Sequence, residues 1–246
     1  MLYHPGAHYL QQKCVTLGKK IAICQSNYIP WKGYFDLINS ADIFVIYDTE
    51  QYTKRDWRNR NLIQTPNGPK WLTIPVQNQT FHQKIEDTIP VDSSWQTKHW
   101  KSIVLNYGKA RYFSDYKGVF EHIYQQDNLT SLSKINYEFI LAICNLLKIR
   151  TTLMWSSQFD LPEGRNQKIL YICKTLNALT YISGPKAKNY LDENLFNQNG
   201  MTVNWMNYSR YPEYAQRFLP FEQGVSILDM IFNLGPDTQN YMKSFK

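Results

Sequence analysis

The chain has 246 residues, of which 43% are apolar, 15% aromatic and 19% charged, and this composition is typical of a folded globular protein and excludes a disordered one. It contains no run of about eighteen uncharged apolar residues and no signal-peptide pattern, so we predict no membrane span and a cytoplasmic protein. The net charge of +7 favours anionic partners: phosphates, nucleotides, nucleic acid or an acidic membrane surface.

The N-terminal residues 1–20 show no apolar period and are predicted to form a flexible leader or to reflect a mis-set start, followed by a single α/β domain at 21–246. Four scattered cysteines form no C-x-x-C pair and have no histidine at ligand spacing: Cys14, Cys24, Cys144 and Cys173. Such cysteines indicate reduced thiols, most of them buried, and we predict no metal site.

Two short apolar runs, residues 21–24 and 43–47, are typical of buried strands. Between them, Pro30 occupies a position that a first helical turn tolerates. The following aromatic and aliphatic residues fall on one helical face: Trp31, Tyr34, Phe35 and Ile38. Residues 21–47 therefore predict a β-α-β unit.

Polar side chains follow both predicted strands, with Gln25, Asn27 and Tyr28 after the first and Asp48 and Gln51 after the second. A parallel crossover places the two strand ends at one edge of the sheet, where α/β proteins bind ligands. These five residues are candidate site residues, although each alone could simply cap a helix or end a strand.

Residues 54–61 (KRDWRNRN) carry four cations, two amides and a tryptophan with no apolar period. Guanidinium groups match phosphate and carboxylate oxygens, so Trp57, Arg58, Asn59 and Arg60 are candidate anion-binding residues. A solvated charged loop is the alternative, and Trp57 argues against it.

Turn residues at 66–69 (PNGP) between apolar segments predict a β-hairpin, and residues 84–91 are predicted to add a further strand. From Ser94 the pattern becomes helical, with an apolar face formed by Trp100, Ile103, Val104 and Tyr107. His99 lies beside this face. It is the best general-base candidate among the five histidines, although a histidine flanked by aromatics is more often a packing residue.

The second half again alternates helix and strand, with helices at 129–147 and 169–176, strands at 152–155 and 180–182, and an apolar helix at 226–233. Ser183, Gly184 and Lys186 directly follow the last of these strands. A strand, a tight turn and a helix start with lysines predict an anion site, with a turn that binds nothing as the alternative. The chain has no P-loop, no G-x-G-x-x-G after a strand, no nucleophile elbow and no H-E-x-x-H motif.

Ordered segments over most of the chain resemble the WbqC-like family. The segments are residues 25–38 (QSNYIPWKGYFDLI), 41–45 (ADIFV), 51–52 (QY), 57–61 (WRNRN), 67–76 (NGPKWLTIPV), 181–184 (YISG) and 226–229 (SILD). The chain departs from the family pattern at Ser26, where relatives usually have proline, and at residues 48–51 (DTEQ), where they often have Asp-Asp-Val-Gln.

The resemblance implies a role in surface-polysaccharide (O-antigen) biosynthesis and suggests a glycine transferase that acts on an amino sugar. The opening β-α-β unit is also similar to that of HUP-type nucleotidyltransferases and ligases, although their H-x-G-H signature is absent here. Together these observations predict a three-layer, Rossmann-like fold with a mostly parallel sheet, flanking helices and an inserted β-hairpin. By analogy this fold would be HUP-like.

We therefore expect a transferase that moves an aminoacyl group such as glycine to an amino sugar or nucleotide-activated sugar, with a nucleotide-activated donor and no metal. Arg58, Arg60 and Lys186 would hold phosphates, Tyr28, Trp31 and Trp57 would stack on rings, and polar side chains would read hydroxyls. His99 or Asp48 would accept a proton. The alternatives are a nucleic-acid-binding protein and a non-catalytic carbohydrate-binding protein.

Overall fold

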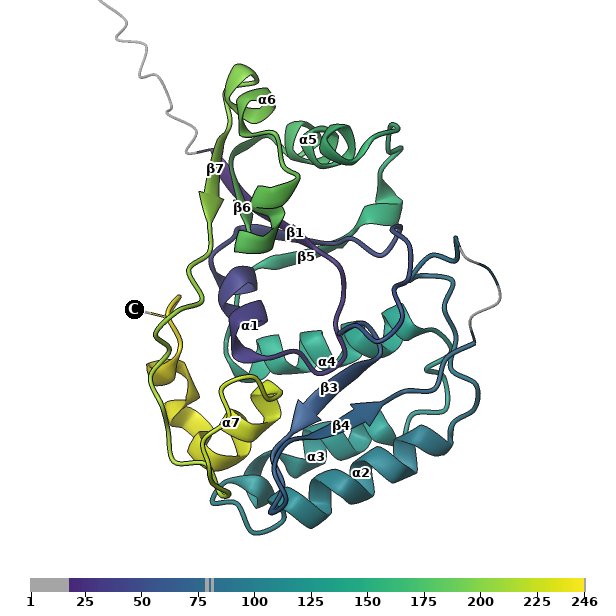
Figure 1. Cartoon of the computed structure of the whole chain (residues 1–246), viewed down its shortest axis with the longest axis vertical. Helices are drawn as coiled ribbons and strands as arrows, with labels where there is room; N and C mark the ends of the chain where they lie inside the picture. Colours follow the sequence, from purple (N-terminus) through teal and green to yellow (C-terminus); the bar gives the residue numbers. More distant parts are fainter. Residues whose placement is uncertain (1–17, 78–79, 81, 246) are drawn as a thin grey trace, which may run out of the picture.

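The structure is a computed structural model and describes residues 18–77, 80 and 82–245 (Figure 1). In chain order its strands and α-helices are β1 (Lys19–Cys24), α1 (Lys32–Asn39), β2 (Ile43–Ile46), β3 (Arg60–Ile63), β4 (Lys70–Thr73), α2 (Ser94–Tyr107), α3 (Phe113–Tyr124), α4 (Leu132–Leu146), β5 (Thr152–Trp155), α5 (Arg165–Thr175), β6 (Ala178–Ser183), α6 (Glu193–Gln198), β7 (Thr202–Trp205) and α7 (Ile227–Leu234). Three short 3-10 helices complete the elements: η1 (Ser156–Gln158), η2 (Pro185–Asn189) and η3 (Gly235–Tyr241). The leader predicted for residues 1–20 lies outside the described residues except for 18–20, of which Lys19 and Lys20 already belong to β1.

Five strands form one sheet in the order β5-β2-β1-β6-β7, and every neighbouring pair is parallel. Numbered by appearance along the chain, the strands of this sheet stand in the order third, second, first, fourth, fifth, which is the Rossmann arrangement. The hairpin β3-β4 pairs separately and antiparallel. The predicted Rossmann-like fold with an inserted hairpin is thus confirmed, while the HUP-like analogy stays a prediction.

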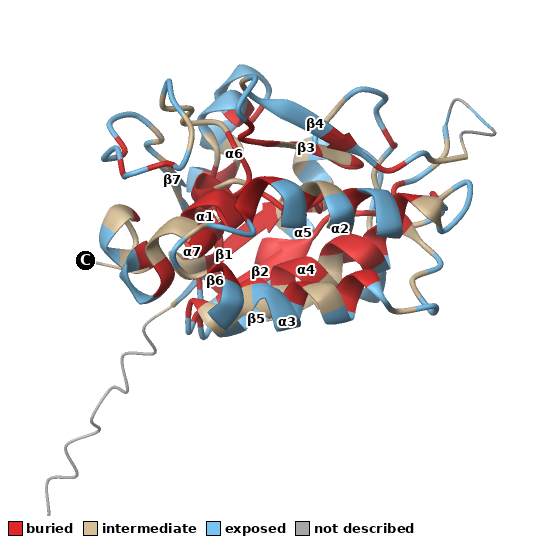
Figure 2. Cartoon of the chain, turned by 90° about the horizontal axis from the view of Figure 1, so that it is seen from below, coloured by how far each residue is buried: buried red, intermediate tan, exposed pale blue. Residues whose placement is uncertain are grey.

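The sheet is the middle of three layers. Side chains on a strand alternate between the two faces of the sheet, and each face packs against its own core. On β1, Ala22 points into the larger core, which it shares with α1, α2, α3, α4 and α7, whereas Ile21 and Ile23 point into a smaller core with α5 and α6. Figure 1 shows α5 and α6 on one side of β1 and β5, and α1 and α4 on the other. Figure 2 shows how the buried residues concentrate around α1, α4 and the sheet.

The first β-α-β unit folds as its apolar pattern predicts. Tyr34, Phe35 and Ile38 form the fully buried face of α1, and Trp31, just before the helix, is half-buried. The hairpin forms around the predicted turn, where Gly68 adopts a φ of 89° that favours glycine.

Two expectations were wrong. Residues 84–91 form no strand but only isolated bridges, Gln51 to Lys84 and Val76 to Pro90, and Pro90 has no N–H with which to extend a ladder. The buried face of α2 is rotated: Val104 is 40% exposed, whereas Trp95 and His99 are buried.

The prediction also missed two elements, α6 and β7. β7 lies at the edge of the sheet and has exposed or half-buried residues throughout, so it lacks the continuous apolar run that marked the other strands.

Candidate active site at the carboxyl edge of the sheet

The strand order reverses between β1 and β6. The helix that follows β1, α1, packs into the larger core on one face, while α6, which follows β6, packs into the smaller core on the other face. In open α/β sheets ligands bind outside the carboxyl ends of the strands at such a reversal. We name the ends of β1 and β6, Cys24 and Ser183, with the loops that follow them, the switch-point edge.

The switch-point edge brings together two segments that are distant in sequence. Burial opposes ionisation of Asp56, but the Arg58 guanidinium, hydrogen bonds from Thr53 Oγ1 and Trp57 N, and the Lys186 ammonium outweigh it and lower the pKa of this carboxyl. Among these influences the charge of Lys186, which follows β6, is the smallest.

Arg58 lies inside this edge. Its side chain is 10% exposed, Nη1 donates to the Ser26 carbonyl at 3.3 Å, and Nη2 lies 3.8 Å from Asp56 Oδ1. Its Nε has no hydrogen-bond partner among the described residues. Arg58 thus adds a fixed positive charge beside the loop after β1 (residues 25–31), which we call the first loop. Little of its side chain is exposed to a ligand.

Asp48 organises the ends of β1 and β2. Its carboxylate accepts hydrogen bonds from Ser26 N at 2.8 Å, Ser26 Oγ at 2.6 Å and Ser133 Oγ at 2.5 Å, and Asn136 Nδ2 donates in turn to Ser26 Oγ. Burial raises the pKa of Asp48, although these hydrogen bonds and the Arg58 charge act in the opposite direction. Asp48 is buried and both of its oxygens accept hydrogen bonds, so it is placed to hold the loop after β1 against α4.

Tyr28 and His99 lie in the larger core. The Tyr28 hydroxyl is 2.9 Å from His99 Nδ1 and 2.5 Å from the Tyr124 hydroxyl, and His99 Nε2 is 3.2 Å from the Thr73 carbonyl. Burial lowers the pKa of His99 to about 4, so the ring is neutral near pH 7. Because the carbonyl can only accept, Nε2 carries the proton and Nδ1 accepts from Tyr28.

The remaining predicted residues are dispersed around the first loop. Gln25 and Trp31 are partly buried; the Gln25 carbonyl accepts from Tyr34 Oη, and the Trp31 ring packs edge-on against Tyr208 at 5.3 Å. Asn27 is buried, and its Oδ1 has no partner within the described part of the chain.

The last two amides of the predicted set lie toward the hairpin side. Asn59 is buried and donates from Nδ2 to the Ile74 carbonyl at 2.8 Å. Gln51 is exposed and forms an isolated β-bridge with Lys84.

The turn after β6 does not offer the helix terminus that the sequence predicted. Ser183 is buried, Gly184 is half-buried, and η2 is a 3-10 helix of five residues, too short to carry a sizeable dipole. Lys186 is exposed at this turn and is the cation of the predicted set that a ligand can reach most directly.

The sequence reading missed three aromatic and cationic residues of this edge. The Arg165 guanidinium lies 4.5 Å over the Tyr190 ring, and Asn166 Nδ2 donates to the Tyr190 carbonyl, so the start of α5 is tied to the loop after β6. Tyr208, which follows β7, lies against Gly184. Recognition of β7 would have placed Tyr208 at a strand end.

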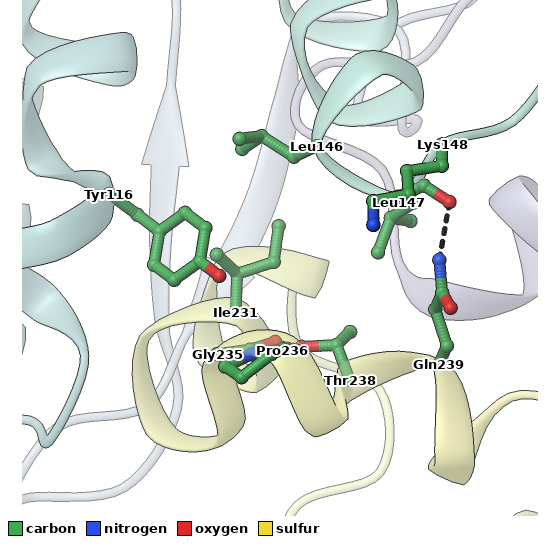
Figure 3. Close-up of a pocket in the computed structure, with 9 residues that line it drawn as sticks. All are labelled: Tyr116, Leu146, Leu147, Lys148, Ile231, Gly235, Pro236, Thr238 and Gln239. Atoms are coloured by element: carbon green, nitrogen blue, oxygen red, sulfur yellow. Dashed lines mark hydrogen bonds between the residues drawn. The ribbon is translucent and has the colours of Figure 1, made fainter.

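Two hollows lie away from the switch-point edge. A cavity of about 190 Å³ opens between α3, the end of α4 and η3 (Figure 3), and is lined by Tyr116, Leu147, Lys148 and Gln239 among others. A second hollow lies beside Asp42 and Arg150. Neither contains a predicted site residue.

Within the described residues, no three His, Cys, Asp or Glu side chains are grouped so that they could hold a metal ion. The described helices include none with both the length and the apolarity that a membrane crossing requires.

The fold and the edge define a Rossmann-like α/β protein whose charged and aromatic residues gather where the strand order reverses. The family model of the WbqC-like protein family matches residues 25–241, and the chain belongs to that family. It is 43% identical over 226 residues, which cover 92% of this chain and 98% of the relative, to a Mycobacterium tuberculosis (strain ATCC 25618 / H37Rv) protein described as uncharacterized protein Rv1507c. No solved structure matches the chain.

Proposed function

We propose that this protein is a transferase of surface-polysaccharide biosynthesis that moves an aminoacyl group such as glycine from a phosphate-activated donor to an amino sugar or nucleotide-activated sugar. The observation that carries the proposal is that the Asp56–Arg58 pair, bonded to the loop after β1, and the exposed Lys186 just after β6 stand beside the carboxyl ends of the two strands between which the order reverses. Membership of the WbqC-like family supports it. A cytoplasmic location belongs to the same proposal, because activated sugars would be substrates there.

The groups at the switch-point edge suit the two substrates. Lys186 and Arg165 are exposed cations that would bind donor phosphates, and the Tyr190 and Tyr208 rings would pack against a base or sugar ring. Asp56, a carboxylate with a lowered pKa, would hold the amino group of the acceptor. The amine nitrogen then forms the new bond to the acyl carbon, the bond from acyl carbon to phosphate oxygen breaks, and the amine proton passes to solvent. Asp48 and His99 have no role in this proposal because both are buried, at 1% and 6% exposed, whereas Asp56 is partly exposed.

A thermal-shift and calorimetric screen of nucleotide sugars and aminoacyl-phosphate analogues tests this proposal. We expect at least one compound to stabilise the parent protein, and Lys186→Ala to weaken its binding about tenfold, which corresponds to about 1.4 kcal/mol. Lys101→Ala, which removes an exposed lysine on α2, should bind like the parent. A screen without any response, or equal affinities for Lys186→Ala and Lys101→Ala, would remove the proposed phosphate site.

A further inference from the structure

Two tryptophans lie together on the molecular surface. Trp57 and Trp71 are 36% and 40% exposed, and their ring centroids are 5.2 Å apart at an interplanar angle of 43°. Trp57 comes from the loop before β3, and Trp71 lies on β4, whose exposed side is visible in Figure 2. Single exposed apolar residues are ordinary, but a pair of adjacent indoles in the open is typical of a binding surface.

A guanidinium covers one of these rings. Arg60 Cζ lies 4.1 Å from the Trp71 centroid, and its Nη2 donates to the Arg55 carbonyl, so the guanidinium is held over the indole. Arg60 is opposite Thr73 in the hairpin and Leu62 is opposite Trp71, so these four side chains share one face.

The opposite face of the hairpin is buried in the larger core through Ile63 and Leu72. The face with Trp71 is therefore the outer one. Arg55 is exposed nearby, and among the described residues neither it nor Arg60 forms an ion pair. We name Trp57, Trp71, Arg60 and Arg55 the hairpin platform.

The platform continues into the switch-point edge. The Trp57 carbonyl accepts the backbone N–H of Tyr28 at 3.0 Å, which ties it to the loop after β1. Asp56, the residue before Trp57, is the carboxylate proposed to hold the acceptor amine, and its Oδ1 lies 3.8 Å from Arg58 Nη2. A chain molecule lying over the two indoles would therefore have one end beside the proposed reaction site.

We propose that the hairpin platform binds an anionic oligosaccharide as the acceptor of the proposed transfer. This inference rests on the proposed function. Sugar rings present C–H faces that pack on the exposed parts of the two indoles, and Arg55 and Arg60 would bind carboxylate or phosphate groups of the glycan. Single-stranded nucleic acid would use the same indoles and cations, and the acceptor role in the proposed transfer is what favours a glycan, so an oligo(dT) strand is one of the probes.

The test is a titration of the full chain, followed by tryptophan fluorescence and calorimetry, with tetragalacturonate as the anionic probe. Neutral maltotetraose and an oligo(dT) strand are the comparison probes. We expect the parent to bind tetragalacturonate more tightly than both, and Trp71→Ala to weaken this binding at least tenfold. Arg60→Gln should weaken tetragalacturonate while leaving maltotetraose unchanged. Tyr171→Ala, which removes an aromatic side chain of similar exposure on α5, should bind like the parent.

The outcomes separate this inference from the proposed function. If the Lys186→Ala protein still binds tetragalacturonate but no longer responds to nucleotide sugars, both the hairpin platform and the phosphate site at Lys186 are supported. If glycan binding depends on Trp71 but no nucleotide sugar or acyl phosphate binds, the platform stands and the transferase fails. Absence of tetragalacturonate binding, equal binding by Trp71→Ala, or tighter oligo(dT) binding that Trp71→Ala abolishes would overturn the glycan platform.

Discussion

Replacement of Asp48 by alanine tests whether this carboxylate holds the switch-point edge together. The substitution leaves three donors without their acceptor, Ser26 N, Ser26 Oγ and Ser133 Oγ, at a residue that is 1% exposed. Each buried donor left unsatisfied costs about 1–3 kcal/mol, and the cost is offset in part because Asp48→Ala removes a charge that burial disfavours. We therefore expect a loss of about 3 kcal/mol in the free energy of unfolding.

For a chain of this size a loss of about 3 kcal/mol lowers Tm by about 6–12 °C. Urea unfolding and thermal melts at pH 7 measure both quantities, with Asp160→Ala as the control because Asp160 is an exposed carboxylate. Asp48→Ala within about 1 kcal/mol of the control would show that the network does not stabilise the fold, and the reasoning would be wrong.

Two further predictions concern α2 and α1. Burial lowers the pKa of His99 from 6.5 to about 4, so between these pH values only the unfolded chain gains a proton at this residue. The free energy of unfolding of the parent should therefore fall by up to about 3 kcal/mol as the pH is lowered from 6.5 to 4. Urea unfolding at several pH values measures this loss. His99→Gln should flatten this dependence and His122→Gln, at an exposed position, should not; identical pH profiles for all three proteins would contradict the assignment. Gly33→Ala should destabilise the protein by about 1–2 kcal/mol, because the clash with the Trp31 ring, 2.4 Å from a Cβ at this position, exceeds the helix-propensity gain of about 1 kcal/mol. Unfolding free energies and near-ultraviolet circular dichroism of Trp31 measure it, and a more stable Gly33→Ala protein would refute the packing argument.

Local patterns along the chain were sufficient to predict much of the fold. The apolar run of β1, the buried face of α1 and the run of β2 are consecutive in sequence, so their periods alone predict the unit that they form. The same holds for α4, whose Ser131 cap accepts the backbone N–H of Lys134.

The candidate site stays a prediction, and the sequence limits it to an edge of the sheet. That edge follows from parallel strands, because the residues after β1 and β6 meet at their carboxyl ends. Residue type could not separate Arg58, which is buried under the first loop, from Arg60, which lies over Trp71 on the outside of the hairpin. The two arginines are only two residues apart, and their surroundings differ because different parts of the chain pack against each of them.

Short-range patterns in the chain were enough to predict the alternation of strands and helices and the family. They could not predict that His99 bonds to Tyr28 in the core, that Ser26 and Ser133 donate to Asp48, or that Trp57 packs against Trp71 on the surface. Each of these contacts joins residues from separate elements. Burial and hydrogen-bond partners are properties of such long-range packing, and they decide whether a polar or aromatic side chain supports the fold or faces a ligand.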